Sequence, residues 1–471
     1  MAQIFFFYDL ETSGLNSRQD RIMQFAGQRT DMNLEPIGEP YNLLVTLNDD
    51  TLPSPDALMV TGITPQKTVE EGYSEAQFAR MLSEEIFMPD TIAVGFNNIR
   101  FDDEFVRHLL WRNFHDPYEW SWKDGRSRWD LLDVVRLTRA LRPEGINWPL
   151  DDKGEPSNRL ELITSANGIA HENAHDALAD VTALIAVTKL IKQKQPQLYD
   201  YLLKMRDKKV VQQLVNMDDK KPFVYASGRY DKEFAKTTVA FPLTTSRNGG
   251  VVVYDLRYDP APFVGLSTEE LSAKIFASWE ERQAEDFVKL PVKELQYNRC
   301  PAVAPLGVLE QGDGWQKISL SAEVVQKHQN ILLNHPDFAE KLRSIFENKP
   351  AFKKMPDPEA QLYDGFLNDR DRLQAEAVRN ADESKLANFH PEFQDERLAP
   401  LLLHYKARNF PRSLSEDDLV QWEAWRAQHL QAQLPQFMAS LQRLASTATD
   451  EQQFILQELQ LWAEAILPTE D

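Results

Sequence analysis

The stretch Ile4–Glu11 has the sequence Ile-Phe-Phe-Phe-Tyr-Asp-Leu-Glu, in which an apolar run leads directly into two carboxylates. A short apolar run followed by polar, turn-forming residues predicts a buried β-strand. Side chains two positions apart on a strand point to the same face, so Asp9 and Glu11 would project together at its end. Two adjacent carboxylates repel each other unless a cation lies between them, and oxygen ligands suit Mg²⁺ or Mn²⁺. A turn or a solvated face remains an equal alternative for this pair, because the same spacing recurs elsewhere in this acidic chain.

The sequence on either side of this stretch predicts an α/β region that ends near Pro196. Apolar runs bounded by Asp, Asn, Gly and Pro indicate further strands, and apolar residues spaced by three and four indicate helices. The predicted strands are Ile22–Arg29, Tyr41–Leu47 and Thr91–Phe96, and the predicted helices are Phe78–Phe87, Leu131–Leu141 and Asp176–Gln193.

The predicted secondary structure changes twice in the remainder of the chain. Short β-rich runs between about 210 and 310 predict a small barrel or sandwich. A proline-rich segment at 350–358 predicts a linker, and the Leu-, Ala- and Gln-rich sequence beyond it predicts amphipathic helices. We therefore expect three domains, over residues 1–195, 196–350 and 351–471. The β-rich runs are Phe223–Ser227, Thr237–Pro242 and Gly250–Leu256, and the C-terminal helices are Asp417–Arg443 and Glu451–Leu467.

Asp102 is a second candidate site residue, because it follows the apolar run Thr91–Phe96 within the string Asn98-Ile-Arg-Phe-Asp102. A carboxylate at the end of a strand can join those of a neighbouring strand. The competing interpretation makes Asp102 or Asp103 the N-cap of a helix over Glu104–Trp111.

His175 and Asp180 form a third candidate pair, although His171–Asp176 and His390–Asp395 have the same spacing. Asp176 lies where a helix should begin and is explained as a cap or a first-turn acid. Asp180 instead falls on the apolar stripe of that helix, where an unpaired carboxylate is costly, so we expect a metal or a cationic partner. The stripe consists of Ala177, Leu184, Val187 and Ile191.

Composition and charge limit the class of protein. The 471 residues are 42% hydrophobic and 27% charged, which is typical of a soluble globular protein of several domains. No apolar run reaches the ~18–20 residues of a membrane span, and the N-terminal run is too short for a signal peptide. A single cysteine, Cys300, cannot form an internal disulfide, so a cytoplasmic location is expected.

The net charge of −21 by itself argues against a nucleic-acid partner, because phosphate binders usually present a cationic surface. The charge is unevenly distributed, however, with −12 over residues 1–195, zero over 196–350 and −9 over 351–471. Clustered metal-binding carboxylates would account for part of the first value, and local basic clusters can supply a cationic track that the total conceals.

The complete constellation, in the order Asp-x-Glu, Asp and His-x-x-x-x-Asp, resembles the histidine-bearing branch of the 3′–5′ exonuclease superfamily, which has a ribonuclease H-like fold. Further strings narrow the resemblance to the bacterial exonuclease I family and extend it over nearly the whole chain. The constellation is Asp9, Glu11, Asp102, His175 and Asp180, and the strings are Gly95–Asp103, Ser127–Asp133, Leu141–Pro149, Ala166–Ile169 and Tyr405–Pro411.

This resemblance implies an α/β ribonuclease H-like exonuclease domain, an SH3-like β-barrel and a C-terminal all-α domain. It implies an Mg²⁺-dependent enzyme that hydrolyses terminal phosphodiesters of single-stranded DNA from the 3′ end, in DNA repair and recombination. Two metal ions, with Mn²⁺ as a possible substitute, would act at the site, and nucleoside 5′-monophosphates would be released. Asp9, Glu11 and Asp180 would hold one ion, Asp102 would support the second, and His175 would accept a proton from the attacking water.

Candidate contacts to single-stranded DNA come from aromatic residues interleaved with cations at 111–148, and from a basic stretch near the C-terminus. Aromatic residues mostly pack in cores, and basic stretches are often solvated helix faces, so a structural role competes at each position. The predicted substrate contacts are Glu11, Arg128, Trp129, Lys406 and Arg408.

The family also implies a protein partner, the acidic and hydrophobic C-terminal tail of single-stranded-DNA-binding protein. Arg142 and Tyr201 match positions of the pocket that receives this tail. A monomer without membrane association is expected.

Two other functions remain open at the level of sequence. An RNA-trimming member of the same superfamily would use identical site chemistry, since only the 2′-OH distinguishes the substrates. A catalytically silent nucleic-acid-binding protein is disfavoured, because a pure binder gains nothing from clustered, mutually repelling acids.

Overall fold

The computed structural model describes residues 3–171, 176–247, 249–349 and 354–468. The chain divides into two compact units. The first comprises Met1–Arg128, His171–Ile185 and Lys353–Asp471, and the second comprises Trp129–Ala170 and Ala186–Phe352. None of the helices within the described ranges is long and apolar enough to cross a membrane. The domain boundaries expected at 195/196 and 350/351 stay a prediction.

The first unit is built on a mixed five-stranded sheet with the order β3-β2-β1-β4-β5. β1 is antiparallel to β2 and parallel to β4, so it lies at the centre of the sheet. The predicted first strand continues to Thr12, which makes Asp9 and Glu11 part of the strand. The strands are β1 (Ile4–Thr12), β2 (Ile22–Thr30), β3 (Pro36–Leu44), β4 (Thr91–Gly95) and β5 (Ser127–Asp130).

An aromatic core covers one face of this sheet. Phe6 and Tyr8 of β1 pack on Phe25 of β2 and on Phe87, with ring centroids 5.7–6.1 Å apart. The helix predicted at 78–87 begins earlier, because Ser74 and Gln77 form a capping box at its start. The surrounding elements are α3 (Glu75–Met81), the π-helical turn η1 (Leu82–Ile86), η2 (Asn98–Arg100), α4 (Asp102–Arg112), η3 (Glu119–Ser121) and α7 (Ala177–Lys194), whose first half belongs to this unit.

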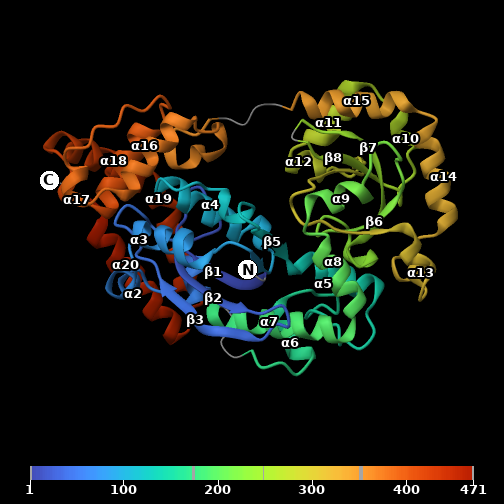
Figure 1. The fold of residues 1–471 in the computed structure, drawn as a ribbon, viewed down its shortest axis with the longest axis horizontal. Coiled ribbons are helices and arrows are strands. Elements are labelled where there is room, and N and C mark those ends of the chain that lie inside the picture. Colours follow the sequence, from blue (N-terminus) through green and yellow to red (C-terminus); the bar gives the residue numbers. More distant parts are fainter. Residues whose placement is uncertain (1–2, 172–175, 248, 350–353, 469–471) are drawn as a thin grey trace. The chain divides into compact units, whose positions relative to one another are not determined.

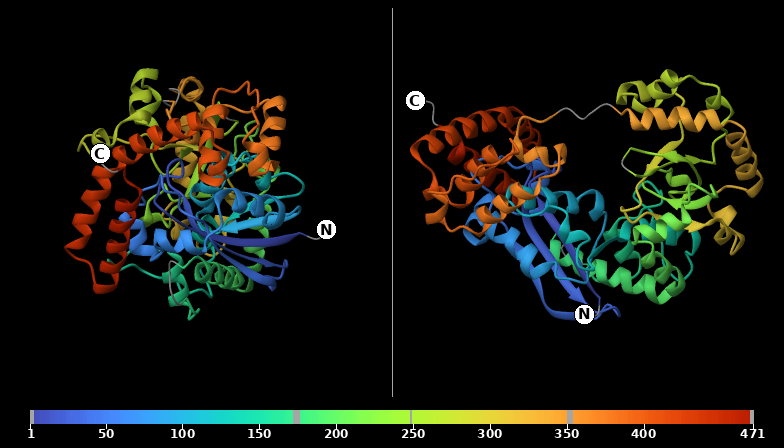
Figure 2. Two further views of the ribbon diagram at one scale, coloured as in Figure 1. Left: turned by 90° about the vertical axis from the view of Figure 1, so that its left-hand side faces the viewer. Right: turned by 45° about the horizontal axis from the view of Figure 1, so that its top comes forward.

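The C-terminal helices pack onto the same unit. α19 (Glu416–Ala445) and α20 (Asp450–Ile466) lie against α1 (Pro55–Thr61), and α20 also contacts α2 (Pro65–Glu71) (Figure 1). The further views in Figure 2 keep these red helices beside the blue N-terminal elements. Both long helices were predicted to within two residues. The other C-terminal elements are η6 (Pro358–Asp364), α16 (Asp369–Asn380), α17 (Glu383–Leu386), α18 (Leu398–Asn409) and η7 (Pro411–Ser413).

The second unit contains an antiparallel five-stranded sheet with the order β10-β6-β7-β8-β9. α5 packs on β6, β7 and β10, and α15 packs on β7 (Figure 1). The three β-rich runs predicted from the sequence are strands β6 to β8, and the predicted helix Leu131–Leu141 is α5. The strands are β6 (Phe223–Ala226), β7 (Thr237–Thr245), β8 (Val251–Asp255), β9 (Val292–Leu295) and β10 (Ala302–Pro305).

The helices of the second unit lie before, between and after these strands. They are α5 (Leu131–Leu141), α6 (Leu160–Ala166), α8 (Pro196–Lys204), α9 (Lys208–Leu214), η4 (Lys232–Phe234), α10 (Ala261–Val264), α11 (Thr268–Phe276), α12 (Trp279–Arg282), η5 (Leu306–Glu310), α13 (Gly314–Lys317), α14 (Ala322–Leu333) and α15 (Pro336–Glu347).

Candidate metal centre

The C-terminal end of β1 presents two carboxylates on one face. Asp9 and Glu11 alternate with Tyr8 and Leu10, which are buried in the aromatic core, so the two acids point away from that core. Both acids are partly exposed. The register between β1 and β2 shifts directly after Glu11, before Thr12 pairs with Ile22. The strand thus presents a pair of carboxylates near its C-terminal end, as the sequence predicts.

Asp180 joins this pair from the first turn of α7. One oxygen from each of Asp9, Glu11 and Asp180 lies within 4.8 Å of the others. Asp176 starts the helix and accepts hydrogen bonds from the backbone N–H groups of Leu178 and Ala179, which confirms its predicted role as a cap. Asp180 instead lies in the cluster, so this residue of the third motif converges with the two acids of the first motif.

His171 also contacts the cluster. Its Nε2 lies 2.6 Å from Oδ1 of Asp180, and its side chain is almost fully buried. His171 and His175 each have an aspartate five positions later, and the resemblance favours His175. Because His175 lies outside the described residues, its predicted role as proton acceptor stays a prediction.

Asp102 is buried at the start of α4 and is close enough to affect both β1 carboxylates electrostatically. The alternative interpretation of Asp102 or Asp103 as an N-cap is wrong. Phe101 occupies the N-cap position, and both aspartates are helical residues. Acids in a first turn interact favourably with the helix dipole, which stabilises their charge at this position.

The cluster is strongly acidic. Burial, followed by the charges of Asp102, Asp180 and Glu11, raises the pKa of Asp9 well above its ordinary value. Burial and the charges of Asp180, Asp102 and Asp176 raise the pKa of Glu11 from 4.5 to about 8. Every one of these interactions opposes ionisation. A bound divalent cation would reverse that balance, because it supplies the opposite charge at the centre of the cluster.

The donor set fits a hard divalent ion. Carboxylate oxygens are the ligands of Mg²⁺ and Mn²⁺, and these three converge from two elements onto one small volume. The site can therefore support metal-assisted hydrolysis of a phosphodiester.

Comparison with known proteins gives the family. Models described as Exonuclease, Exonuclease I SH3-like domain and Exonuclease I C-terminal domain match residues 6–188, 206–348 and 356–466. The exodeoxyribonuclease I of Haemophilus influenzae is 40% identical over 449 residues, which cover 95% of this chain and 94% of the relative. That of Escherichia coli is 38% identical over 464 residues, which cover 97% of this chain and 96% of the relative. The chain belongs to the exonuclease I family.

Solved structures of exonuclease I agree with this assignment along the whole chain. Escherichia coli exonuclease I in complex with a dA16 oligonucleotide has a TM-score of 0.94 and 38% identity, and covers 99% of this chain and 100% of that one. Exonuclease I from Methylocaldum szegediense gives the same TM-score, identity and coverage. A zinc-bound Escherichia coli complex with single-stranded DNA has a TM-score of 0.94 and 37% identity, with 99% and 100% coverage. The predicted fold class of exonuclease, SH3-like and helical C-terminal parts is confirmed, and the chain is a nuclease whose family and acidic cluster indicate a divalent metal.

Three of the residues predicted to contact DNA are cations that lie beside carboxylates in the structure. Arg128 is buried and forms an ion pair with Asp103. Lys406 is 6% exposed and lies 3.5 Å from Asp418. Arg408 pairs with Asp50 at 2.6 Å and also with Glu359. Buried cations paired with carboxylates would have to break those pairs to reach DNA, so each has a structural role here, and its predicted contact with the substrate stays a prediction.

Trp129 is likewise a core residue. Its side chain is 1% exposed and packs edge-on against Tyr199, with ring centroids 5.4 Å apart. Trp111 and Trp120 are also buried, whereas Trp122 is 64% exposed. Among the tryptophans of this segment, Trp122 is the one whose ring is most open to a base. Trp129 therefore packs in the core, and its predicted contact with DNA stays a prediction.

The two residues expected to receive a partner's tail lie in the second unit. Arg142 is half-buried and donates to the carbonyl of Leu141 and to the side chain of Gln311 at 3.2 Å. Tyr201 is also half-buried, and its hydroxyl donates to the carbonyl of Val303 at 3.1 Å. These local contacts are compatible with a binding surface and do not test it.

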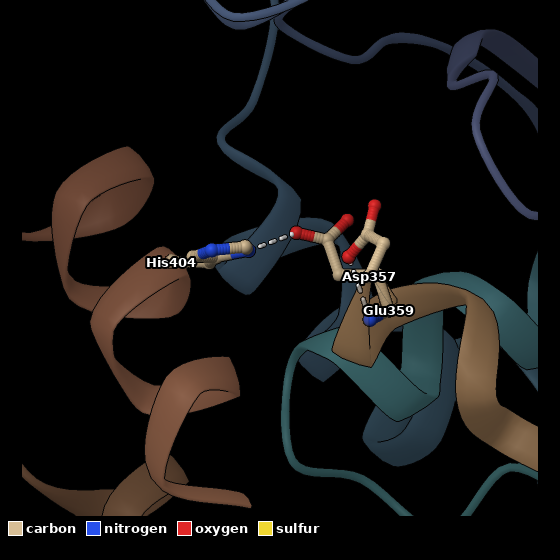
Figure 3. A group of neighbouring side chains, drawn as sticks. All are labelled: Asp357, Glu359 and His404. Carbon is tan, nitrogen blue, oxygen red and sulfur yellow. Dashed lines mark hydrogen bonds and ion pairs between the residues drawn. The ribbon is translucent and has the colours of Figure 1, made fainter. Parts of the chain in front are cut away.

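A second group of metal-ligating side chains lies in the first unit, where Asp357, Glu359 and His404 meet (Figure 3). His404 Nδ1 is 2.9 Å from Glu359, whose other oxygen is 2.9 Å from Arg21. Burial opposes ionisation of Glu359, but Arg408 and Arg21 outweigh it and hold its pKa well below the ordinary value. Two guanidinium groups already neutralise this carboxylate, so the group is a buried ion-pair cluster that joins the C-terminal helices to the exonuclease sheet.

Sequence reasoning missed two features around the metal centre. It did not assign His171, whose spacing to Asp176 only duplicated that of His175 to Asp180. It considered Asp103 only as a helix cap, although Asp103 directly follows the candidate ligand Asp102. Tyr8, adjacent to Asp9, contacts this second acid.

Proposed function

We propose that this chain is a 3′–5′ exonuclease that removes nucleotides from single-stranded DNA with Mg²⁺. The observation that carries the proposal is the convergence of Asp9, Glu11 and Asp180 in a chain of the exonuclease I family. Relatives with 38–40% identity are exodeoxyribonucleases, and related structures contain single-stranded oligonucleotides, which supports DNA as the substrate. An RNA substrate and a silent binding protein are left as outcomes of the test.

The acidic residues of the site would bind metal ions, and a histidine would act as the base. Asp9, Glu11 and Asp180 would hold Mg²⁺, or Mn²⁺ as a substitute, and Asp102 would support a second ion. When bound, such ions stabilise the attacking and leaving oxygens of an in-line displacement. His175 would accept the proton of the attacking water, a task suited to an imidazole near neutral pH. Glu11, at the exposed end of the pair, would also border the terminal nucleotide.

The substrate path would use exposed groups. Trp122 is open to stacking with an unpaired base, and such stacking is tolerant of base identity. Release of nucleoside 5′-monophosphates from the 3′ end would follow from hydrolysis at the terminal phosphodiester. A role in DNA repair and recombination, a cytoplasmic location and a monomeric state belong to the same proposal.

Docking of the C-terminal tail of single-stranded-DNA-binding protein is a separate part of the proposal. Arg142 would pair with the acidic groups of that tail, and Tyr201 would contact its apolar end. Both side chains are half-buried in the second unit, so each keeps part of its surface open to a partner.

End-labelled single-stranded DNA, duplex DNA and RNA of one sequence, incubated with and without Mg²⁺, test the proposal. We expect metal-dependent shortening of single-stranded DNA that far exceeds that of duplex or RNA. Asp180→Asn should lower turnover by orders of magnitude while the protein stays folded by circular dichroism. Equal trimming of RNA would favour the exoribonuclease, and DNA binding without shortening would favour the silent protein.

A further inference from the structure

Asp103 is a fully buried carboxylate one residue after the candidate metal ligand Asp102. It accepts hydrogen bonds from the hydroxyl of Tyr8 and from Nδ2 of Asn98, the latter at 3.2 Å, and it forms an ion pair with Arg128. Its two carboxylate oxygens are thus shared among three donors from three different segments of the first unit. A buried acid with so many partners fixes those segments relative to one another.

The position of Tyr8 gives this arrangement its significance. Tyr8 immediately precedes Asp9 on β1, so the two side chains point to opposite faces of the sheet. Asp103 immediately follows Asp102 in the first turn of α4. The Tyr8–Asp103 hydrogen bond therefore ties together, from the core side, the two segments that carry the acids Asp9 and Asp102.

The charges of the group are balanced without any contribution from the metal centre. Arg128 neutralises Asp103, and its side chain is 8% exposed. The hydroxyl of Tyr8 donates a hydrogen bond to Asp103 from the core side of β1. A neutral donor and one cation satisfy the buried carboxylate.

We propose that Tyr8, Asp103 and Arg128 form a positioning clamp that sets the separation of Asp9 and Asp102 for metal binding. This inference rests on the proposed function, because it concerns the positioning of acids in the same metal centre. The clamp residues touch neither substrate nor metal and act only through the two acids beside them. Loss of the clamp loosens the ligand set, and the metal then binds more weakly.

Tyr8→Phe in the full-length protein is the test, because it removes one hydroxyl and leaves the ring in the core. Mn²⁺ binding measured by calorimetry in the absence of DNA should weaken by about tenfold, the lower end of the effect of disturbing groups that orient metal ligands. The Mn²⁺ concentration for half-maximal nuclease activity should rise in parallel. The KM for single-stranded DNA at saturating Mn²⁺ should stay unchanged.

Tyr254→Phe is the matched control. Tyr254 is buried in the second unit, and its hydroxyl has no hydrogen-bond partner among the described residues. This variant should bind Mn²⁺ like the wild type. A general loss of stability would affect KM and all activity together, whereas the clamp predicts a change confined to metal affinity.

Arg128→Lys provides a second variant, which keeps the charge but shortens the reach, and it carries the test if Tyr8→Phe does not fold. It should also weaken Mn²⁺ binding. If Tyr8→Phe folds and binds Mn²⁺ with wild-type affinity, the clamp is overturned and the proposed function stays intact. If Tyr8→Phe does not fold, wild-type Mn²⁺ affinity in Arg128→Lys has the same meaning. A wild-type protein that binds Mn²⁺ but leaves single-stranded DNA uncut would overturn the proposed function, while calorimetry would still decide on the clamp.

Discussion

Substitution of a metal ligand should stabilise the metal-free protein, because the site holds acids that repel one another. Glu11→Gln is the clearest case. The folded protein raises the pKa of Glu11 from 4.5 to about 8, first through burial and then through the charges of Asp180 and Asp102. Between these two pH values the folded state keeps a proton that the unfolded state has released, so stability falls as the pH rises through this window.

The magnitude follows from the size of that shift. At 1.36 kcal/mol per pKa unit, the penalty borne by wild-type Glu11 is about 1 kcal/mol at pH 5 and about 4 kcal/mol at pH 8. Glutamine has the same shape as the protonated acid and carries no charge. Glu11→Gln should therefore exceed the wild type in free energy of unfolding by roughly these amounts, with the difference growing with pH.

Urea denaturation in EDTA at pH 5 and pH 8, followed by tryptophan fluorescence, measures the effect as a shift in midpoint at constant slope. The control is Glu70→Gln on α2, an exposed position, which should show no pH-dependent difference. Added Mg²⁺ should stabilise the wild type more than Glu11→Gln, since the variant has lost a ligand. A variant less stable than the wild type at pH 8 without metal, or a difference independent of pH, would refute the reasoning.

Three further predictions concern the other groups described above. Glu359→Gln should lower the free energy of unfolding by about 3–5 kcal/mol, because it leaves Arg21 and Arg408 buried without their shared partner. Glu392→Gln, at an exposed position, is the control, and a urea midpoint of Glu359→Gln equal to that of the wild type would contradict the ion-pair assignment. Trp129→Ala should lower the free energy of unfolding by about 3–5 kcal/mol with little change in KM for DNA, whereas Trp122→Ala should raise KM and leave stability nearly unchanged. A raised KM in Trp129→Ala with unchanged stability would support Trp129 as a DNA contact. Arg142→Glu should weaken binding of an acidic, hydrophobic tail peptide in fluorescence anisotropy, with exposed Lys153→Glu as control, and unchanged affinity would remove Arg142 from the proposed pocket.

Local patterns in the sequence predicted the elements that carry the metal centre. The alternation of β1 and the apolar stripe of α7 place Asp9, Glu11 and Asp180 correctly, because each depends only on the period of one strand or helix. The stripe residues Ala177 and Leu184 are indeed buried. The family resemblance then linked motifs that lie far apart in the chain, which no local pattern does.

The sequence pattern did not show the carboxylate partners of the cations expected to contact DNA. Arg408 meets Asp50, and the two are separated by 358 positions, so this cation of the basic stretch lies in a buried ion pair. Lys406 and Arg128 also lie beside carboxylates, those of Asp418 and Asp103. Composition cannot distinguish a cation that faces phosphate from one that faces a buried carboxylate.

The most direct measurement of the central claim follows the two ends of one single-stranded DNA. With Mg²⁺, a 3′-labelled oligonucleotide should release its label at once as a nucleoside 5′-monophosphate, while a 5′-labelled one shortens progressively. Chelation of the metal, or Asp180→Asn, should abolish both signals. Early release of the 5′ label, internal fragments, or degradation that persists in EDTA would contradict the account.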